Sequence, residues 1–334
     1  MTSELAPEQH PGVLSELNYF SPQFFQNNIV SEYTRTFLPQ SAPTHDTPIE
    51  FHIESSSGVF LDLNDTDFEV RLRIVHRNGT ALAAGEQCVP ANQILHTMWK
   101  SVELYMNGTQ VTEAHTLYPY LAYMSTLTNY GADVQTTRLL SAGWTKDTGN
   151  KFDINVSTDA SENEGQLQRA KWFRESRWNT LIDKLNIDPF QQQLLIPGVT
   201  LFLRLIPHNP EFCLIAPAAT PAVGAAPAIP APDFRLDINR AVLRIPCKEI
   251  NVNQLAAIQK MMLMKPILLP FGKRAIKHFT VGTGASSFGQ DNAYIGTIPH
   301  RVTIMMVADT NFSGSYITIP FFSINLPCLI LPST

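Results

Sequence analysis

The segment Phe68-Glu69-Val70-Arg71-Leu72-Arg73-Ile74 alternates apolar and charged side chains without a break. A period of two is typical of a strand with one face in a hydrophobic core and the other in water. The same alternation occurs over residues 49–53 and 102–106. These segments therefore predict a sheet that is buried on one side.

Two Asn-Gly pairs, at Asn78-Gly79 and Asn107-Gly108, directly follow two of these strands. Asn-Gly favours tight hairpin turns, so the strands should be antiparallel. Further strand patterns occupy residues 181–187, 199–206, 212–215 and 234–245, and later ones residues 276–281, 302–307 and 316 to 326. About eight strands precede residue 250, the number that one jelly roll requires. The pattern predicts an all-β chain with one complete jelly roll and part of a second, making a double jelly roll of antiparallel β-sandwiches.

Two short helices are expected in the connections, over residues 117–131 and 253–264. In both segments apolar residues recur at helical spacing, and Gly131 or Pro266 ends the pattern. The polar residues 145–177 predict a loop, and the Ala- and Pro-rich residues 216–232 an extended spacer.

The charge is unevenly distributed along the chain. Its 334 residues carry a net charge of −5, but residues 1–250 hold 18 basic and 27 acidic side chains and residues 251–334 hold six and two. A change of sign indicates two modules in different surroundings. We therefore expect an N-terminal arm (1–45), a first jelly roll (46–250), and a connector helix with a partial second jelly roll (251–334).

The amino-acid composition argues against several classes of protein. The hydrophobic share of 44% is that of a globular chain, and no window has the roughly 18 apolar residues of a membrane helix. Residues 1–12 lack the apolar centre of a signal peptide. The acidic balance argues against a protein that wraps nucleic acid. The four cysteines are far apart, which favours a reducing compartment over disulfides or zinc.

No catalytic pattern is found: there is no P-loop, no Gly-x-Ser-x-Gly and no paired-histidine metal motif. One acidic cluster resembles a calcium loop and consists of Asp62, Asn64, Asp65 and Asp67. It lacks the glycine and the closing glutamate of an EF-hand, so we interpret it as a turn. The expectation is a non-enzyme without catalytic, metal or cofactor-binding residues.

One basic and aromatic patch lies between Arg169 and Trp178. Its members are Arg169, Lys171, Trp172, Phe173, Arg174, Arg177 and Trp178. Arginine beside aromatic rings suits contact with DNA. An interface or a loop packed on the sandwich is the reading we favour, and both remain open at this point.

Several blocks resemble one family. Residues 117–123 (Leu-Tyr-Pro-Tyr-Leu-Ala-Tyr) and 127–131, the hairpin 102–109, and residues 194–199 leading to 212–214 are similar to segments of the major capsid proteins of Polinton (Maverick) elements and adintoviruses. So are residues 294–302, 312–316 and 320–321. The resemblance covers roughly residues 25 to 321, in the right order of blocks.

The chain departs from this family at two places. Ile319 stands where the family usually has Asn, and residues 322–334, after Phe321, match nothing in it. Because members continue further into the second jelly roll, the resemblance suggests a C-terminally truncated or domesticated copy.

The resemblance implies a hexon: a homotrimeric capsomer of pseudo-hexagonal outline that contacts neighbouring capsomers and a minor (penton) capsid protein. Such capsomers tile an icosahedral capsid around double-stranded DNA, without sequence-specific binding and without a membrane span. It implies a virion protein assembled in the host nucleus or cytoplasm. The alternative is a carbohydrate-binding or hydrolytic jelly-roll protein, because this fold alone does not decide function.

Overall fold

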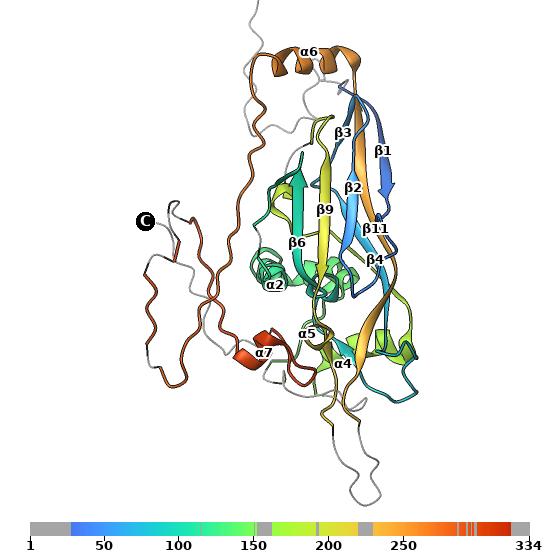
Figure 1. Ribbon diagram of the computed structural model, residues 1–334, viewed down its shortest axis with the longest axis vertical. Helices are drawn as coiled ribbons and strands as arrows, with labels where there is room; N and C mark the ends of the chain where they lie inside the picture. Colours follow the sequence, from blue (N-terminus) through green and yellow to red (C-terminus); the bar gives the residue numbers. More distant parts are fainter. Residues whose placement is uncertain are drawn as a thin grey trace, which may run out of the picture.

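Figure 1 shows the computed structural model, an upright β-sandwich with one helix across its upper end. The structure describes residues 28–113, 115–149, 151, 162–191, 194–219, 230–285, 287–291, 293–294, 296 and 299–321. The first sheet has the order β1-β11-β4-β8, and β3 also pairs with β11. Its strands are β1 (Ile29–Phe37), β3 (Val59–Leu61), β4 (Asp67–His76), β8 (Asn179–Asp183) and β11 (Phe234–Ile250).

The second sheet has the order β2-β9-β6-β7. Its strands are β2 (Ile49–Ile53), β6 (Trp99–Met106), β7 (Thr109–Gln110) and β9 (Leu201–Pro207). A small ladder joins β5 (Val89–Pro90) to β10 (Leu214–Ile215). All these pairings are antiparallel.

The pairing of the strands identifies a complete jelly roll. If the eight strands of the two four-stranded paths are counted along the chain, the first pairs with the last (β1 with β11) and the second with the seventh (β2 with β9). The third pairs with the sixth (β4 with β8), and the fourth with the fifth (β6 with β7). One long antiparallel ribbon that is rolled into two facing sheets gives this order. The predicted all-β class and the first jelly roll are thus confirmed.

The core lies between the two sheets and follows the alternation seen in the sequence. Phe68, Leu72 and Ile74 are fully buried, while Arg71 points to the outside. The Phe68 ring packs edge-on against Phe51 of the facing sheet, with ring centroids 6.2 Å apart. Each such side chain contributes roughly 1.5–3 kcal/mol when it leaves water, which explains why the charged alternates stay outside.

The Asn107-Gly108 turn joins β6 to β7 as predicted. Both residues have positive φ, 48° and 79°, which is the type I′ geometry that matches the twist of paired strands. Gly79 also has a positive φ, and the Val75–Ala81 bridge closes that turn.

Both predicted helices are present, as α2 (Tyr118–Asn129) and α6 (Val252–Met262). The predicted loop 145–177 is partly wrong, because residues Glu164–Phe173 form helix α4. The Asn163 side chain caps this helix by accepting a hydrogen bond from the Gln166 amide. The remaining helices are α1 (Ile94–Thr97), α3 (Ala132–Thr136), α5 (Pro210–Cys213) and α7 (Asp309–Ser313), with 3-10 turns η2 (Arg138–Ala142), η3 (Arg174–Ser176) and η4 (Asp188–Gln191).

Three predictions need correction within the first module. The strand expected at 181–187 ends at Asp183, in β8. Residues 29–37 of the expected irregular arm form β1, because β11 is long enough to pair with them over its second half. Of the strand expected at 212–215, only residues 214 and 215 are extended, and the residues before them belong to α5.

The segment after α6 differs most from the prediction. Among its described residues, up to 321, none belongs to a strand of a sheet, so the strands expected at 276–281 and 302–307 are not formed, nor is the described part of the one from 316. Strands need neighbouring strands to satisfy their backbone groups, and among the described residues no named strand pairs with this segment. The assignment of residues 251–334 to a partial second jelly roll stays a prediction.

Candidate assembly interface

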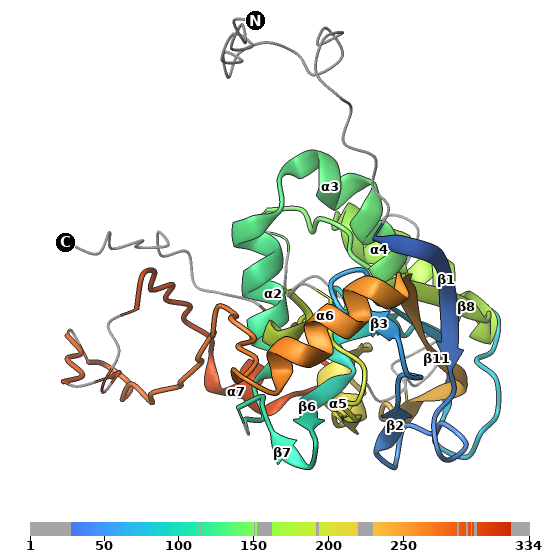
Figure 2. The ribbon, with the colours of Figure 1, turned by 90° about the horizontal axis from the view of Figure 1, so that it is seen from above.

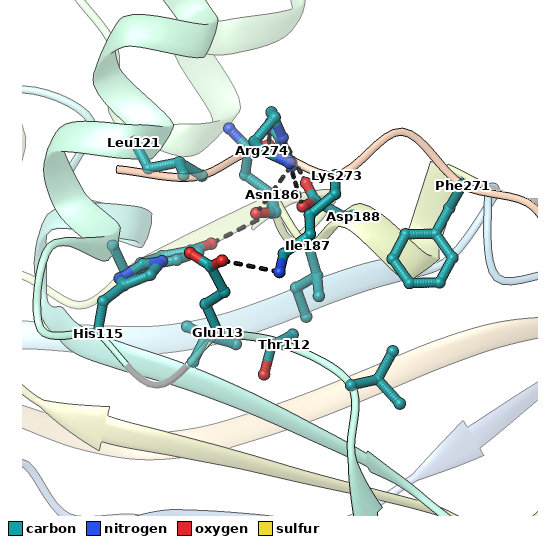
Figure 3. A pocket seen from close by; sticks show the side chains of 13 residues that line it. Thr112, Glu113, His115, Leu121, Asn186, Ile187, Asp188, Phe271, Lys273 and Arg274 are labelled. Carbon is teal, nitrogen blue, oxygen red and sulfur yellow. Dashed lines mark hydrogen bonds and ion pairs between the residues drawn. The ribbon is translucent and has the colours of Figure 1, made fainter. Parts of the chain in front are cut away.

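Residues 271–277 lie against the first jelly roll where α2, β6 and η4 meet, and Arg274 holds them there (Figure 3). Arg274 donates through Nε to Asp188 Oδ1 at 2.5 Å, and its backbone N–H donates to Oδ2 of the same carboxylate at 2.7 Å. Its Nη1 donates to Ser125 Oγ at 2.9 Å and to the side-chain oxygen of Asn186. The guanidinium is 25% exposed and the carboxylate 14%, so the pair is shielded from water. We call these four residues the Arg274 clamp.

Lys273 forms a weaker contact beside the clamp. Its Nζ lies 2.8 Å from Glu113 Oε1; the lysine side chain is exposed and the glutamate side chain is half-buried. The pocket that the clamp borders is also lined by His115, Leu121 and Phe271. Burial lowers the pKa of His115, so its imidazole is neutral at pH 7.

A chain of hydrogen bonds runs from the clamp into the core. The Asn186 amide donates to Tyr118 Oη at 3.2 Å, and that hydroxyl lies 2.9 Å from His96 Nδ1. On its other side, His96 Nε2 lies 3.4 Å from Asp183 Oδ2. Burial raises the pKa of Tyr118 well above its ordinary value, so the phenol remains protonated. A buried neutral phenol is no nucleophile, and we read this chain as positioning Asn186.

A second contact site joins residues 312–321 to the sandwich through aromatic rings. Phe321 stacks on Tyr123 with centroids 4.2 Å apart, and Phe312 stacks on Tyr120 at 5.6 Å. Tyr120 Oη donates to the carbonyl of Pro320 at 3.2 Å. We call Tyr120, Tyr123, Phe212, Phe312 and Phe321 the aromatic anchor.

Gly314 allows this anchor to close. Its φ is 88°, and a Cβ there would lie 3.1 Å from the Cβ of Phe212. Tyr316 adds two further contacts: its Oη donates to the carbonyl of Phe234, and its carbonyl accepts from the Ala216 amide.

Outside these two anchors, the segment after β11 exposes apolar side chains. Leu263 is 90% exposed, and no residue of α6 is buried. The described apolar side chains that are exposed beyond α6 include Met264, Leu268, Phe279, Phe288, Ile304 and Met306. Figure 2 shows that much of the described segment between α6 and α7 extends away from the sandwich, whereas Ile276 and Met305 pack against the aromatic anchor. An exposed apolar surface of this extent is characteristic of an interaction site.

The structure separates the members of the predicted basic and aromatic patch. Arg169 is fully buried and donates to Asp147 Oδ1 at 2.9 Å and to the carbonyl of Pro90. Phe173 is buried in the core as well. These two residues hold α4 to the sandwich and are not free to contact DNA. Trp178, by contrast, lies under Arg71 and Arg73, which the sequence analysis did not connect with it.

The acidic cluster is divided among cations. Asp62 pairs with Lys248 at 2.9 Å and Asp65 with Lys184 at 2.7 Å. The hydrogen bond and the positive charge of Lys184 lower the pKa of Asp65. No group of three or more metal-ligating side chains occurs within the described ranges. Nor does any helix there have the length and apolar character to cross a membrane.

Comparison with known proteins gives low identities throughout. No protein-family model matches the chain. An uncharacterized protein of Caenorhabditis elegans is 20% identical over 287 residues, which are 82% of this chain and 62% of that protein. The chain thus spans less than two thirds of the length of this relative.

Several solved structures with similarity to this chain are viral. A chain of the Sputnik virophage structure has a TM-score of 0.48 at 12% identity, covering 75% of this chain and 53% of that one. The Faustovirus major capsid protein has 0.45 at 12%, covering 74% and 59%. The mavirus major capsid protein has 0.36 at 14%, covering 75% and 52%. In each case this chain spans between half and three fifths of the neighbour.

Proposed function

We propose that the chain is a structural subunit of an icosahedral capsid, a major capsid protein that assembles with copies of itself. The observation that carries this proposal is the combination of two structural features. One is a complete jelly roll. The other is the segment after β11, which is anchored to the jelly roll at two places and leaves its remaining apolar side chains exposed.

The exposed segment supports assembly because its apolar side chains are unfavourable in water. Phe288 and Ile304 are 51% and 58% exposed, so covering each of them gives roughly half of the 1.5–3 kcal/mol of full burial. The segment after residue 250 is also net positive, whereas the residues before it are net negative. Contact between the segment of one copy and the sandwich of the next would bring opposite charges together and favour association.

The finer parts of the proposal follow from the family resemblance in the sequence. They are kinship with Polinton and adintovirus capsid proteins, a homotrimeric hexon and a penton partner. We also propose that the capsid encloses double-stranded DNA, that it assembles in the host nucleus or cytoplasm, and that the chain is part of the virion. Residues from 251 onward would then belong to a second sandwich that becomes ordered as a sheet when strands are supplied beside it.

The test is the mass of the full-length protein in solution, measured by gel filtration with light scattering, and electron microscopy of the same fractions. We expect trimers or larger closed assemblies. Phe288→Ser with Ile304→Ser should reduce the assembled fraction, because both side chains are exposed in the single copy.

The matched control is Leu38→Ser, since Leu38 is an exposed apolar residue on the sandwich itself. A well-folded monomer at all concentrations would contradict the proposal. So would an assembled fraction that the double variant leaves unchanged. Binding of polysaccharide by such a monomer would favour the carbohydrate-binding alternative.

A further inference from the structure

Trp178 and four arginines form a surface on the outer face of the first sheet, which we call the Trp178 cluster. The guanidinium carbons of Arg73 and Arg71 lie 4.5 Å and 5.5 Å from the centre of the Trp178 ring. The other members are Arg240 and Arg244 on β11, of which Arg240 is the cross-strand partner of Arg71. In Figure 2, β8 lies on the side of the sandwich opposite to the described segment between α6 and α7, so the cluster is distinct from that exposed segment.

The cluster carries more positive charge than its neighbours neutralise. Asp237 pairs with Arg73 at 2.8 Å, and Glu69 is shared between Arg240 and Arg244. Glu69, Asp237 and Asp67, the cross-strand partner of Arg244, therefore face four guanidinium groups. Among the described residues, no carboxylate pairs with Arg71, although its side chain is exposed.

The register of the strands adds to this excess. Arg71 of β4 is the direct partner of Arg240 of β11 across the sheet. Like charges directly opposite each other destabilise a sheet, so this pair is unfavourable unless an anion lies over it. The first 250 residues are strongly acidic overall, which makes a local excess of arginine harder to explain as a general surface property.

The identity of the cations points to phosphate. All four are arginines, and the planar guanidinium presents paired donors that match a phosphate or carboxylate, whereas lysine offers a single point charge. Arg71 and Arg240 are directly opposite each other, and Arg73 and Arg244 lie to either side of this pair along the strands. The backbone of a nucleic acid presents phosphates in a row that could contact several of these arginines together.

We propose that the Trp178 cluster binds the phosphate backbone of nucleic acid, without reading its sequence. The guanidinium groups already cover the Trp178 ring, so the ring orients the arginines and does not stack on bases. Binding of this kind is electrostatic and depends steeply on salt.

The experiment measures fluorescence anisotropy of a short labelled DNA duplex with the full-length protein, between about 50 and 200 mM salt. The logarithm of affinity should fall with the logarithm of salt concentration by about 0.9 for each phosphate contact. Arg71→Ala with Arg240→Ala should reduce this slope by about 1.8. Over that salt range the wild type should then lose roughly tenfold more affinity than the double variant.

Two control variants separate charge from folding. Arg71→Lys with Arg240→Lys should retain most of the slope, because each lysine keeps the charge. Arg204→Ala should leave the slope unchanged, since Arg204 lies on the other sheet between Glu50 and Glu103. Thermal melting of each variant shows whether it is folded.

Several outcomes would overturn the inference: no salt-dependent binding by the wild type, an unchanged slope in the double alanine variant, or an equal loss in Arg204→Ala. A change in assembly mass without a change in the slope would also overturn it. That result would indicate that the cluster contacts an acidic surface of a second copy. The assay needs no assembled particle. If the protein binds DNA in this way but forms no trimer, the inference stands and the proposed function is contradicted.

Discussion

Removal of the Arg274 side chain should release residues 271–277 from the sandwich while the jelly roll stays folded. In Arg274→Ala, the Asp188 carboxylate loses the guanidinium and keeps only the backbone N–H of residue 274. Asn186 and Ser125 lose a donor as well. The perturbation is therefore confined to the clamp.

The size of the effect follows from burial. A hydrogen bond to a charged group contributes about 1.5–3 kcal/mol, and because the guanidinium is 25% exposed we take a value near the lower end, about 2 kcal/mol. That free energy corresponds to a factor of about 30 in the opening equilibrium of the segment.

Hydrogen exchange followed by mass spectrometry measures this opening directly. The backbone amide of residue 274, whose hydrogen bond to Asp188 depends on the clamp, should exchange about 30-fold faster in Arg274→Ala. Peptides from β4 and β11 should be unchanged, because these strands form the centre of the first sheet.

Lys273→Ala is the matched control. Its ion pair with Glu113 is exposed, 61% on the lysine side, and such a pair contributes about 0–1 kcal/mol. Exchange should therefore rise about fivefold at most. Equal acceleration in the two variants, or acceleration that extends into β4 and β11, would refute the argument that the clamp holds this segment.

Three further predictions concern the jelly roll itself. Arg169→Met should lower the free energy of unfolding by about 3 kcal/mol, because it leaves Asp147 buried without its partner. Urea denaturation should show no comparable loss in the control Lys171→Met, because the Lys171 side chain is exposed. Gly108→Ala should destabilise the chain by about 1–2 kcal/mol because φ is positive there, and Gly131→Ala, where φ is −72°, should not; equal urea midpoints for both would contradict the turn geometry. Burial lowers the pKa of His45 to about 4, so below about pH 6.5 the unfolded chain binds a proton at this histidine and the folded chain does not. The free energy of unfolding should therefore fall as the pH drops from 6.5 towards 4. This fall should be smaller in His45→Gln than in the wild type or in a variant of the exposed His52.

Local features of the fold could be predicted from residues that are close in the sequence. The strand at 68–74 follows from its alternation, and the hairpin from Asn107-Gly108, because one face of a pleated strand is buried and a type I′ turn needs two positive φ angles. Helix α4 was missed, although Asn163 followed by Gln166 is a pattern that favours a helix start.

The candidate sites depended on contacts between residues that are far apart in the chain. Arg169 looked like part of an exposed patch, but its partner Asp147 and the carbonyl of Pro90 bury it. Trp178 acquired Arg71 as a neighbour only when β8 paired with β4.

The sequence by itself determined that the chain is a β-protein with two tight Asn-Gly turns and a net positive segment after residue 250. The tertiary structure decided which strands pair, that Arg274 and Phe321 join this segment to the sandwich, and which arginines share one face. The physical reason is that alternation and turn chemistry depend on residues that are neighbours in the sequence. Ion pairs, ring stacking and strand register instead join residues separated by up to about two hundred positions, and a single sequence contains no local pattern that identifies such partners.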